Sequence, residues 1–376
     1  MAADRARQAH RQVVRLLVLL GLGGVAIAAV LALLGHNYYR LYRHGQSARE
    51  GVVRVESEAH VRERFGAEVR ARLQARDFAG LDAQAAELRR TRETFAGTSV
   101  PKLTQFYRAL GDRGPRPEAE WTRSLDLMDA WIRERPASVT ARVGAAEMTT
   151  SYAWDARGDG WSSEVPEDRM LAFHQRLEQA HRLVRGADGL SERCPRRAAT
   201  LLHIANGLSW PKDEEQRLYE EAVREFPDEQ TYHTLHLRYL QPIWHGAPGD
   251  WQAAGQRILE LPGGPEKYAY AVWHTSLGSR TGRELVSWPA LKRGFDAISA
   301  RHPDWFEAKS AYCAFASMYV DKATTQRLLA DIGYRMDPSV WSDQEWFVRT
   351  HQWAEYEDSE RDGADPLARV FSWFMR

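Results

Sequence analysis

The strongest feature of the hydrophobic pattern is an uncharged run near the start of the chain. Residues Leu16 to Leu34 read LLVLLGLGGVAIAAVLALL. About 20 apolar residues in a helix cross the hydrocarbon core of a bilayer, and a helix satisfies its backbone hydrogen bonds within the segment. Tyr38, Tyr39 and Tyr42 follow the run, as in an interfacial aromatic belt. The pattern predicts one transmembrane helix over this run, with the lipid bilayer as its partner.

The flanking sequence bears on the topology of this segment. Residues 1–15 form a short basic tail, which favours the cytoplasmic side, and a long C-terminal domain can translocate largely regardless of its charge. We therefore expect a single-pass protein of the inner (cytoplasmic) membrane, with its C-terminal domain periplasmic or extracellular. A cleaved signal peptide is the alternative, but the sequence GHNYYRLYRHG after Leu34 offers no small-x-small cleavage site. Basic residues flank both ends, so the charge difference that orients the helix is small.

Polar positions follow the apolar run, and amphipathic segments begin after them. Residues 35–64 are charged and weakly patterned, which predicts a juxtamembrane stalk or a helix that continues from the membrane. Residues 65–110 predict a helical hairpin, because apolar side chains recur near helical spacing and Asp77 can cap a second helix. The recurring positions are Val69, Leu73, Phe78, Leu81, Ala85 and Leu88.

A cluster of helix-breaking residues, GDRGPRP at 111–117, separates this hairpin from the rest of the chain. The remainder, residues 118–376, alternates helical patterns with turn signals, and no stretch keeps a two-residue period long enough to predict a sheet. Its first helical stripe is Trp121, Leu125, Met128 and Ile132. We therefore predict an all-α fold, in which an N-terminal transmembrane helix precedes an α-solenoid-like array of helical hairpins.

Three segments of the chain repeat a loose pattern. ERPASVTARVGAAEM begins at Glu134, REFPDEQTYHTLHLRYL at Arg224 and ARHPDWFEAKSAYCAFA at Ala300. Each places a proline between an amphipathic helix and a helix rich in small and aromatic residues, because proline fits the first turn of a helix but not its interior. The pattern is typical of tetratricopeptide-like hairpins, which stack because one hairpin cannot bury its apolar face alone. The uneven spacing of the three starts indicates insertions.

Charge and cysteine content narrow the function classes. The 51 Lys and Arg balance 51 Asp and Glu, so the net charge is zero and the clustered basic surface that nucleic acid requires is not indicated. Cys194 and Cys313 share no short spacing, so two buried thiols are the simpler interpretation and a long-range disulfide is the alternative. We expect no cofactor, because the sequence has no P-loop, Rossmann or GxSxG fingerprint.

The most distinctive stretch is YLQPIWHG, at residues 239–246. Its proline ends the helix that carries His236, and the glycines beyond it allow a tight loop. The functional interpretation is a loop that presents Trp244 and His245 to a ligand or partner, with Tyr239 and His236 beside them. The structural alternative is a rigid turn between hairpins whose Trp fills the core, a common use of aromatic side chains at helix junctions.

Two other groups of side chains are candidates for chemistry. His233, His236 and His245 are candidate metal ligands, but zinc sites usually add Cys or carboxylate ligands at defined spacing, so we predict no metal. Four carboxylates could supply the acid and base that a glycosidase requires, although no spacing singles out a pair. They are Glu134, Glu147, Asp155 and Asp159.

YLQPIWHG resembles a bacterial family, together with LQARDFAGLDAQAAELRR at 73–90 and the ARGDGW loop at 156–161. The family is DUF4034, which is membrane-anchored and catalogued only as a domain of unknown function. The resemblance covers roughly residues 65–300, and Trp244 and Gly246 match its hallmark after the proline. It implies a helical, repeat-like fold and no established activity, so no catalytic residue carries over.

These patterns lead to two hypotheses for the function. The first is a membrane-anchored helical-repeat scaffold of the bacterial envelope that binds an unknown protein or peptide. The second is an envelope hydrolase on a helical scaffold, for which an analogy of fold is the main warrant. The first is favoured, because the sequence has an anchor and hairpin-like patterns but no catalytic motif.

Overall fold

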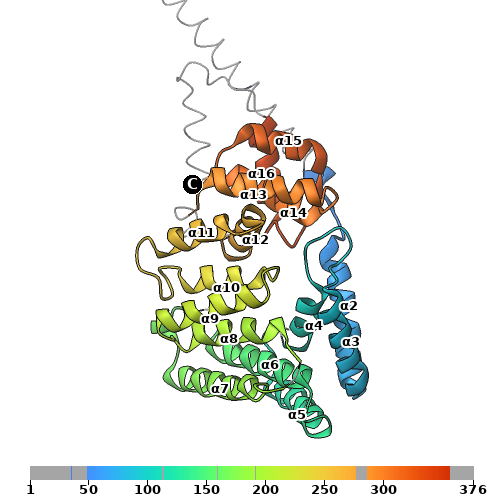
Figure 1. The fold of residues 1–376 in the computed structure, drawn as a ribbon. Helices are drawn as coiled ribbons and strands as arrows, with labels where there is room; N and C mark the ends of the chain where they lie inside the picture. Colours follow the sequence, from blue (N-terminus) through green and yellow to red (C-terminus); the bar gives the residue numbers. More distant parts are fainter. Residues whose placement is uncertain are drawn as a thin grey trace, which may run out of the picture. The chain divides into compact units, whose positions relative to one another are not determined.

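The fold of the described residues is all-α, apart from one pair of two-residue strands and one isolated bridge (Figure 1). The computed structural model describes Gly35 and residues 49–111, 114–158, 160–190, 192–276 and 286–355. They form two compact units, residues 55–321 and the terminal segments 49–54 and 322–355. The predicted transmembrane run, 16–34, lies outside the described residues, and no described helix is long and apolar enough to span a membrane.

The larger unit consists of the helices α2 to α14 and one short 3-10 helix, η1. Their bounds are α2 Glu58–Gln74, α3 Phe78–Thr91, α4 Lys102–Gly111, α5 Glu118–Glu134, α6 Val139–Arg157, η1 Ser162–Glu164, α7 Glu167–Arg185, α8 Pro195–Gly207, α9 Lys212–Glu225, α10 Thr231–Tyr239, α11 Asp250–Glu260, α12 Gly264–Ser276, α13 Trp288–Arg301 and α14 Phe306–Met318.

Consecutive helices of this unit pack in pairs: α5 with α6, α7 with α8, α9 with α10, α11 with α12, and α13 with α14. The second helices of the pairs also contact one another in order, from α6 through α8 and α10 to α12 (Figure 1). Helix α4 extends this row by packing against α6. The all-α prediction is therefore confirmed for the described residues, and the stacked pairs are those of a helical-repeat protein.

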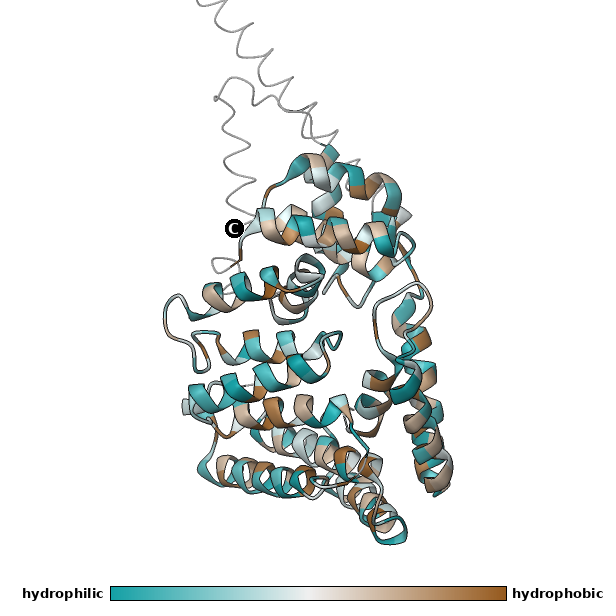
Figure 2. Ribbon diagram, viewed as in Figure 1, coloured by the Kyte–Doolittle hydropathy of each residue, from teal (hydrophilic) through white to brown (hydrophobic). Residues whose placement is uncertain are grey.

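The two helices of a pair bury their surfaces in different ways. In α5 the predicted stripe positions Trp121 and Met128 are each 1% exposed, whereas Leu125 and Ile132 are half-buried and Trp131, outside the stripe, is buried. In α6 12 of 19 residues are buried, and in α14 10 of 13, and most of the buried residues are Ala, Gly, Ser or Thr. The first helices of the pairs carry both hydrophilic and hydrophobic positions (Figure 2). Small side chains let the second helix of a pair approach neighbouring helices on several sides.

The three predicted helix–proline–helix segments share one backbone geometry. The last residue before each proline is Arg135, Phe226 or His302, and its φ and ψ angles are −130° and 67°, −133° and 74°, and −131° and 67°, respectively. A proline disfavours the helical conformation of the residue before it, which explains why α5, α9 and α13 all end at this point. The predicted repeat is thus confirmed at its turns.

Gly294 of α13 shows how closely two helices of the larger unit approach. A Cβ atom at this position would lie 2.2 Å from the carbonyl oxygen of Pro265 and 2.5 Å from the Cβ of Ala269, both in α12. Real Cβ atoms do not come this close to a backbone atom, so any larger residue would move one helix. Glycine is therefore required for the packing of α12 against α13.

The first helices of the larger unit form the predicted hairpin. Helix α2 ends at Gln74, and Asp77 caps α3 by accepting a hydrogen bond of 3.0 Å from the backbone N–H of Gly80. Such a cap satisfies an N–H group that has no partner within the helix. The chain therefore turns at Asp77 instead of continuing as one long rod.

The boundaries of the compact units differ from the predicted limits at 65–110 and 118–376. One hydrophobic core runs from Val69 of α2 to Met148 of α6, across the GDRGPRP segment, and the larger unit ends at residue 321. Breaker residues mark where a helix stops, but they do not show which helices share a core. The segment 111–117 therefore connects helices of one core.

Helix α2 starts within the predicted stalk, 35–64, and contacts the opposite end of the larger unit. The carboxylate of Glu58 accepts hydrogen bonds from the backbone N–H groups of Phe306 and Glu307, at 3.0 and 3.2 Å. Arg62 donates two hydrogen bonds of 2.7 Å to the carboxylate of Glu307. The segment predicted as a stalk or a continuing helix therefore includes the first turns of α2. The partners of its charged side chains lie about 245 residues away and leave no local pattern.

The smaller unit joins segments from both ends of the described chain. Strand β1, Val53–Arg54, pairs in parallel with β2, Arg335–Met336. Arg49 donates hydrogen bonds of 3.0 and 2.9 Å to the carboxylate of Glu345 in α16, Gln344–Glu355. Helix α15, Lys322–Ile332, packs against α16. The part of the predicted stalk from residue 49 onward is therefore folded.

Both cysteines are free and buried. Cys194 lies at the start of α8, with its Sγ atom 3.3 Å from the hydroxyl oxygen of Tyr107. Burial raises the pKa of the Cys313 thiol. The two buried thiols confirm the simpler of the two predictions, and the long-range disulfide is not formed.

Gly294→Ala tests the close approach of α12 and α13. We expect the free energy of unfolding to fall by about 1–3 kcal/mol, because the added methyl group forces the backbones apart. The measurement is chemical denaturation of the full chain in detergent micelles, followed by circular dichroism. Gly160→Ala is the control, since no atom lies within 3.4 Å of a Cβ at that position, and it should change the stability by less than about 0.5 kcal/mol. Equal stability of the two variants would contradict the packing described above.

Candidate functional site

The YLQPIWHG segment forms a tight loop directly after α10. The backbone N–H groups of Trp244 and Gly246 donate to the carbonyl oxygen of Gln241, at 2.9 and 3.2 Å. A Cβ on Gly246 would lie 1.9 Å from the carbonyl oxygen of Leu240, so no other residue fits there without a shift of the backbone. The predicted tight loop is confirmed, and its shape sets the direction of the Trp244 side chain.

Two of the predicted site residues hold this loop against neighbouring helices. The Nε2 atom of His245 is 2.8 Å from the carbonyl oxygen of Asn206 in α8, and its ring lies 4.5 Å from the ring of Tyr239. The hydroxyl of Tyr239, whose side chain is buried, donates to the carbonyl oxygen of Trp210 at 2.6 Å. Tyr239 and His245 therefore position the loop.

Trp244 meets residues from two other helices at a cluster that we call the aromatic junction, made of Trp154, Arg157, His203 and Trp244. The rings of Trp154 and Trp244 lie 5.7 Å apart and nearly perpendicular, and His203 stacks on Trp154 at 5.5 Å. The guanidinium of Arg157 lies 5.7 Å from the Trp154 ring centroid and 5.5 Å from that of Trp244. Both distances are within the range of a cation–π interaction.

The aromatic junction brings together two motifs that lie far apart in the sequence. Arg157 belongs to the ARGDGW loop, and Trp244 belongs to YLQPIWHG. All four side chains of the junction are half-buried. Each motif also carries a large exposed side chain: Trp161 is 66% exposed and Ile243 is 50% exposed. Exposed large apolar residues beside a packed aromatic cluster are typical of a binding surface.

Polar atoms without partners accompany the junction. The Nε1 atom of Trp154 and both polar atoms of the Asn206 side chain are buried and make no hydrogen bond among the described residues. Asn206 is 3% exposed and lies one helical turn after His203, so the two share a face of α8. Buried polar groups are nearly always hydrogen-bonded, so these three atoms require a water or a ligand.

His236 lies apart from this junction, in a buried polar cluster between α9 and α10. Its Nδ1 atom is 2.9 Å from the carboxylate of Glu215, and its ring stacks on Tyr219 at 3.9 Å. The hydroxyl of Tyr219 is 2.8 Å from Nδ1 of His233. Burial, followed by the charges of Lys267 and His236, lowers the pKa of His233 to about 3. These residues are a packed network of the interior.

The three predicted candidate metal ligands are divided between these two places. His233 and His236 are in the buried cluster, whereas His245 contacts Tyr239 and Asn206. Among the described residues, no group of three or more His, Cys, Asp or Glu side chains could hold a metal ion. Helical spacing places His233 and His236 together, but the loop carries His245 away from them.

The three candidate carboxylates that the structure describes lie in different surroundings and are not paired with one another. Glu147 is paired with Arg196 at 2.6 Å and accepts from Thr200, while Asp155 accepts a hydrogen bond of 2.6 Å from Nε1 of Trp121. Glu134 lines a cavity elsewhere, and Asp159 lies outside the described residues.

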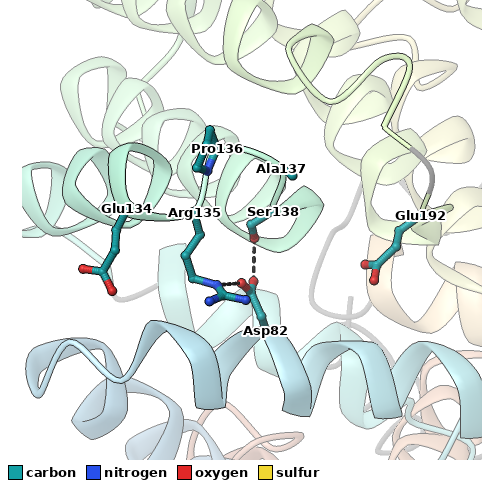
Figure 3. Close-up of a pocket in the computed structure, with 7 residues that line it drawn as sticks. All are labelled: Asp82, Glu134, Arg135, Pro136, Ala137, Ser138 and Glu192. Atoms are coloured by element: carbon teal, nitrogen blue, oxygen red, sulfur yellow. Dashed lines mark hydrogen bonds and ion pairs between the residues drawn. The ribbon is translucent and has the colours of Figure 1, made fainter.

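The cavity that contains Glu134 has a volume of about 260 Å³ and lies at the turn between α5 and α6 (Figure 3). Asp82 of α3 points into it and interacts with Arg135 and with the hydroxyl of Ser138, which lies 2.5 Å away. Glu192, on another wall, interacts with Arg89. Because these carboxylates are already paired with arginines, the cavity is held together by ion pairs and carries no evident catalytic group.

Fold and site together define a helical-repeat protein with an aromatic junction where α6, α8 and the loop after α10 meet. The family model of the domain of unknown function DUF4034 matches residues 67–245, just under half of the chain. The match agrees with the resemblance that the motifs indicated. It spans the junction residues from Trp154 to Trp244 and ends at His245. No curated protein and no solved structure matches the chain.

Sequence patterns located one half of the aromatic junction. Trp244 was a predicted site residue, and Arg157 lies in a loop that the family resemblance singled out. His203 and Asn206 carried no signal, because each is an ordinary helical position whose importance depends on the contact of α8 with α6 and the loop. Tyr239 and His245 hold the loop against neighbouring helices, and His236 is buried in the interior cluster.

The lowered pKa of His233 predicts that the protein loses stability in acid. Below about pH 6.5 the unfolded chain binds a proton at this histidine, whereas the folded chain does not until about pH 3. The free energy of unfolding should therefore fall by up to about 1.4 kcal/mol per pH unit in this interval. In His233→Gln the slope between pH 6.5 and 4 should be correspondingly shallower, as measured by urea denaturation. His174→Gln, at an exposed position, should keep the wild-type slope; an unchanged slope in His233→Gln would exclude this origin.

Proposed function

We propose that this protein is a membrane-anchored scaffold whose aromatic junction binds a protein or a peptide. The apolar run Leu16–Leu34 would anchor it as a single-pass protein of the inner membrane, with the helical domain on the periplasmic side. The observation that carries the binding role is the meeting of Trp154 and Arg157 with Trp244 in a half-buried cluster. Tryptophan and arginine are the residues that most often dominate the energy of protein interfaces.

The arrangement of the junction supports binding more than catalysis. Its four side chains are aromatic or cationic, and none of them is a nucleophile beside a general base. Trp161 and Ile243 extend the apolar surface into solvent. Stacked helical pairs present such residues on a rigid frame, so little conformational entropy is lost when a ligand binds. The support for the anchor is the apolar run in the sequence alone.

Photo-crosslinking from the loop tests the binding role. Benzoylphenylalanine placed at Ile243 of the full chain should form a discrete crosslinked product in intact cells. Val320, which is 70% exposed in the same compact unit, is the control position and should not give that product. Adding Trp244→Leu should reduce the yield from Ile243 by at least about tenfold, since a central aromatic anchor typically contributes 2 kcal/mol or more. Equal products from both positions, or no effect of Trp244→Leu, would contradict the proposal.

The membrane topology has its own test. Protease added to spheroplasts should digest the domain that follows Leu34, because a basic N-terminal tail favours the cytoplasmic side. The readout is an immunoblot against a C-terminal tag, and a cytoplasmic marker protein must stay intact in the same sample. Full protection of the tag with intact inner membranes would reverse the proposed orientation.

A further inference from the structure

We propose that the aromatic junction recognises a carboxylate in an apolar peptide segment, and that Arg157 is the residue that binds it. This inference rests on the proposed binding function and names the chemistry of the ligand. Three observations carry it: the hydrogen bonding of the Arg157 guanidinium, the two indole rings within cation–π distance of it, and the exposed apolar side chains close to the junction in the sequence.

The Arg157 guanidinium has N–H donors that no described residue uses. Its Nη1 donates to the carbonyl oxygen of Gly158 at 2.9 Å, and no carboxylate among the described residues pairs with it. Arg176 provides the contrast. Its guanidinium also lies over an aromatic ring, 3.3 Å from the centroid of Tyr152, but it is paired with the carboxylate of Glu118 at 3.7 Å. A guanidinium has five N–H donors, so Arg157 can still bind an anion through two of them.

The indole rings prepare Arg157 for this role. Contacts with Trp154 and Trp244 restrict a side chain that would otherwise lose considerable rotamer entropy when a ligand binds. They also remove water from part of the guanidinium, which strengthens its attraction for an anion. The planar guanidinium matches the two oxygens of a carboxylate, so the fit favours a carboxylate over a single point charge.

The surroundings indicate that the carboxylate belongs to a peptide. Nucleic acid binding requires an extended basic surface, and this chain has no net charge. The exposed side chains of Trp161 and Ile243 each lie within four residues of a junction residue in the sequence, and they offer apolar contacts to the positions next to the acid. An Asp or Glu flanked by apolar residues meets both requirements.

A peptide array tests this assignment with the full chain in detergent micelles. The probes are decapeptides with blocked ends and a central Glu flanked by Ala, Leu, Phe or Pro, each synthesised beside a partner in which Gln replaces the Glu. Wild-type protein should bind the best Glu peptides at least about tenfold more tightly than their Gln partners, by fluorescence anisotropy. Arg157→Gln should abolish this preference. Arg176→Gln, which removes an arginine that already has a carboxylate partner, should keep it.

The outcomes separate this inference from the proposed function. If wild-type protein binds Glu and Gln peptides equally, or if Arg157→Gln retains the preference, the carboxylate assignment is wrong. Loss of all peptide binding in Trp244→Leu would in that case still support the junction as the binding site. If wild-type protein binds no peptide and Ile243 gives no crosslinked product, both the inference and the proposed function fail. Circular dichroism of each variant shows that it is folded.

Discussion

The rest of the larger unit depends on the close packing of helices lined by small residues. Helix α6 contacts α4, α5, α7 and α8, and 12 of its 19 residues are buried. Eight of these twelve are Ala, Gly or Thr, whose small side chains allow the close approach. The packing places Trp154, near the end of α6, against Phe173 of α7 and His203 of α8. A bulkier inner helix would separate these neighbours, and the aromatic junction would not form.

The polar groups inside the larger unit fall into two kinds. Glu147 with Arg196, and Glu215 with His236, are buried pairs in which the carboxylate lies within hydrogen-bond distance of its partner. Such pairs hold neighbouring helices together in the interior. Arg157 is of the other kind, because it is half-buried and no carboxylate among the described residues pairs with it. This difference supports the proposed binding surface at Arg157.

Local patterns predicted the helices well and their assembly poorly. The stripe that begins at Trp121, the cap at Asp77 and the three prolines all act within a few residues, so their effects could be read from the sequence. The contacts of Glu58 and Arg62 with Glu307, and the pairing of β1 with β2, join segments far apart in the chain. Amphipathic spacing carries no information about such partners. The limits of the compact units therefore differ from the domain limits that the sequence predicted.

The sequence by itself determined that the chain is helical, where its helices turn, and that YLQPIWHG forms a tight loop with Trp244 at its end. These properties follow from backbone sterics and from the period of apolar positions. The tertiary structure decided which residues Trp244 meets, because that depends on how α6 and α8 pack beside the loop. The Arg157 guanidinium therefore lies within cation–π distance of two indole rings only when these elements come together. A contact between distant segments is a property of their packing, and no single segment contains it.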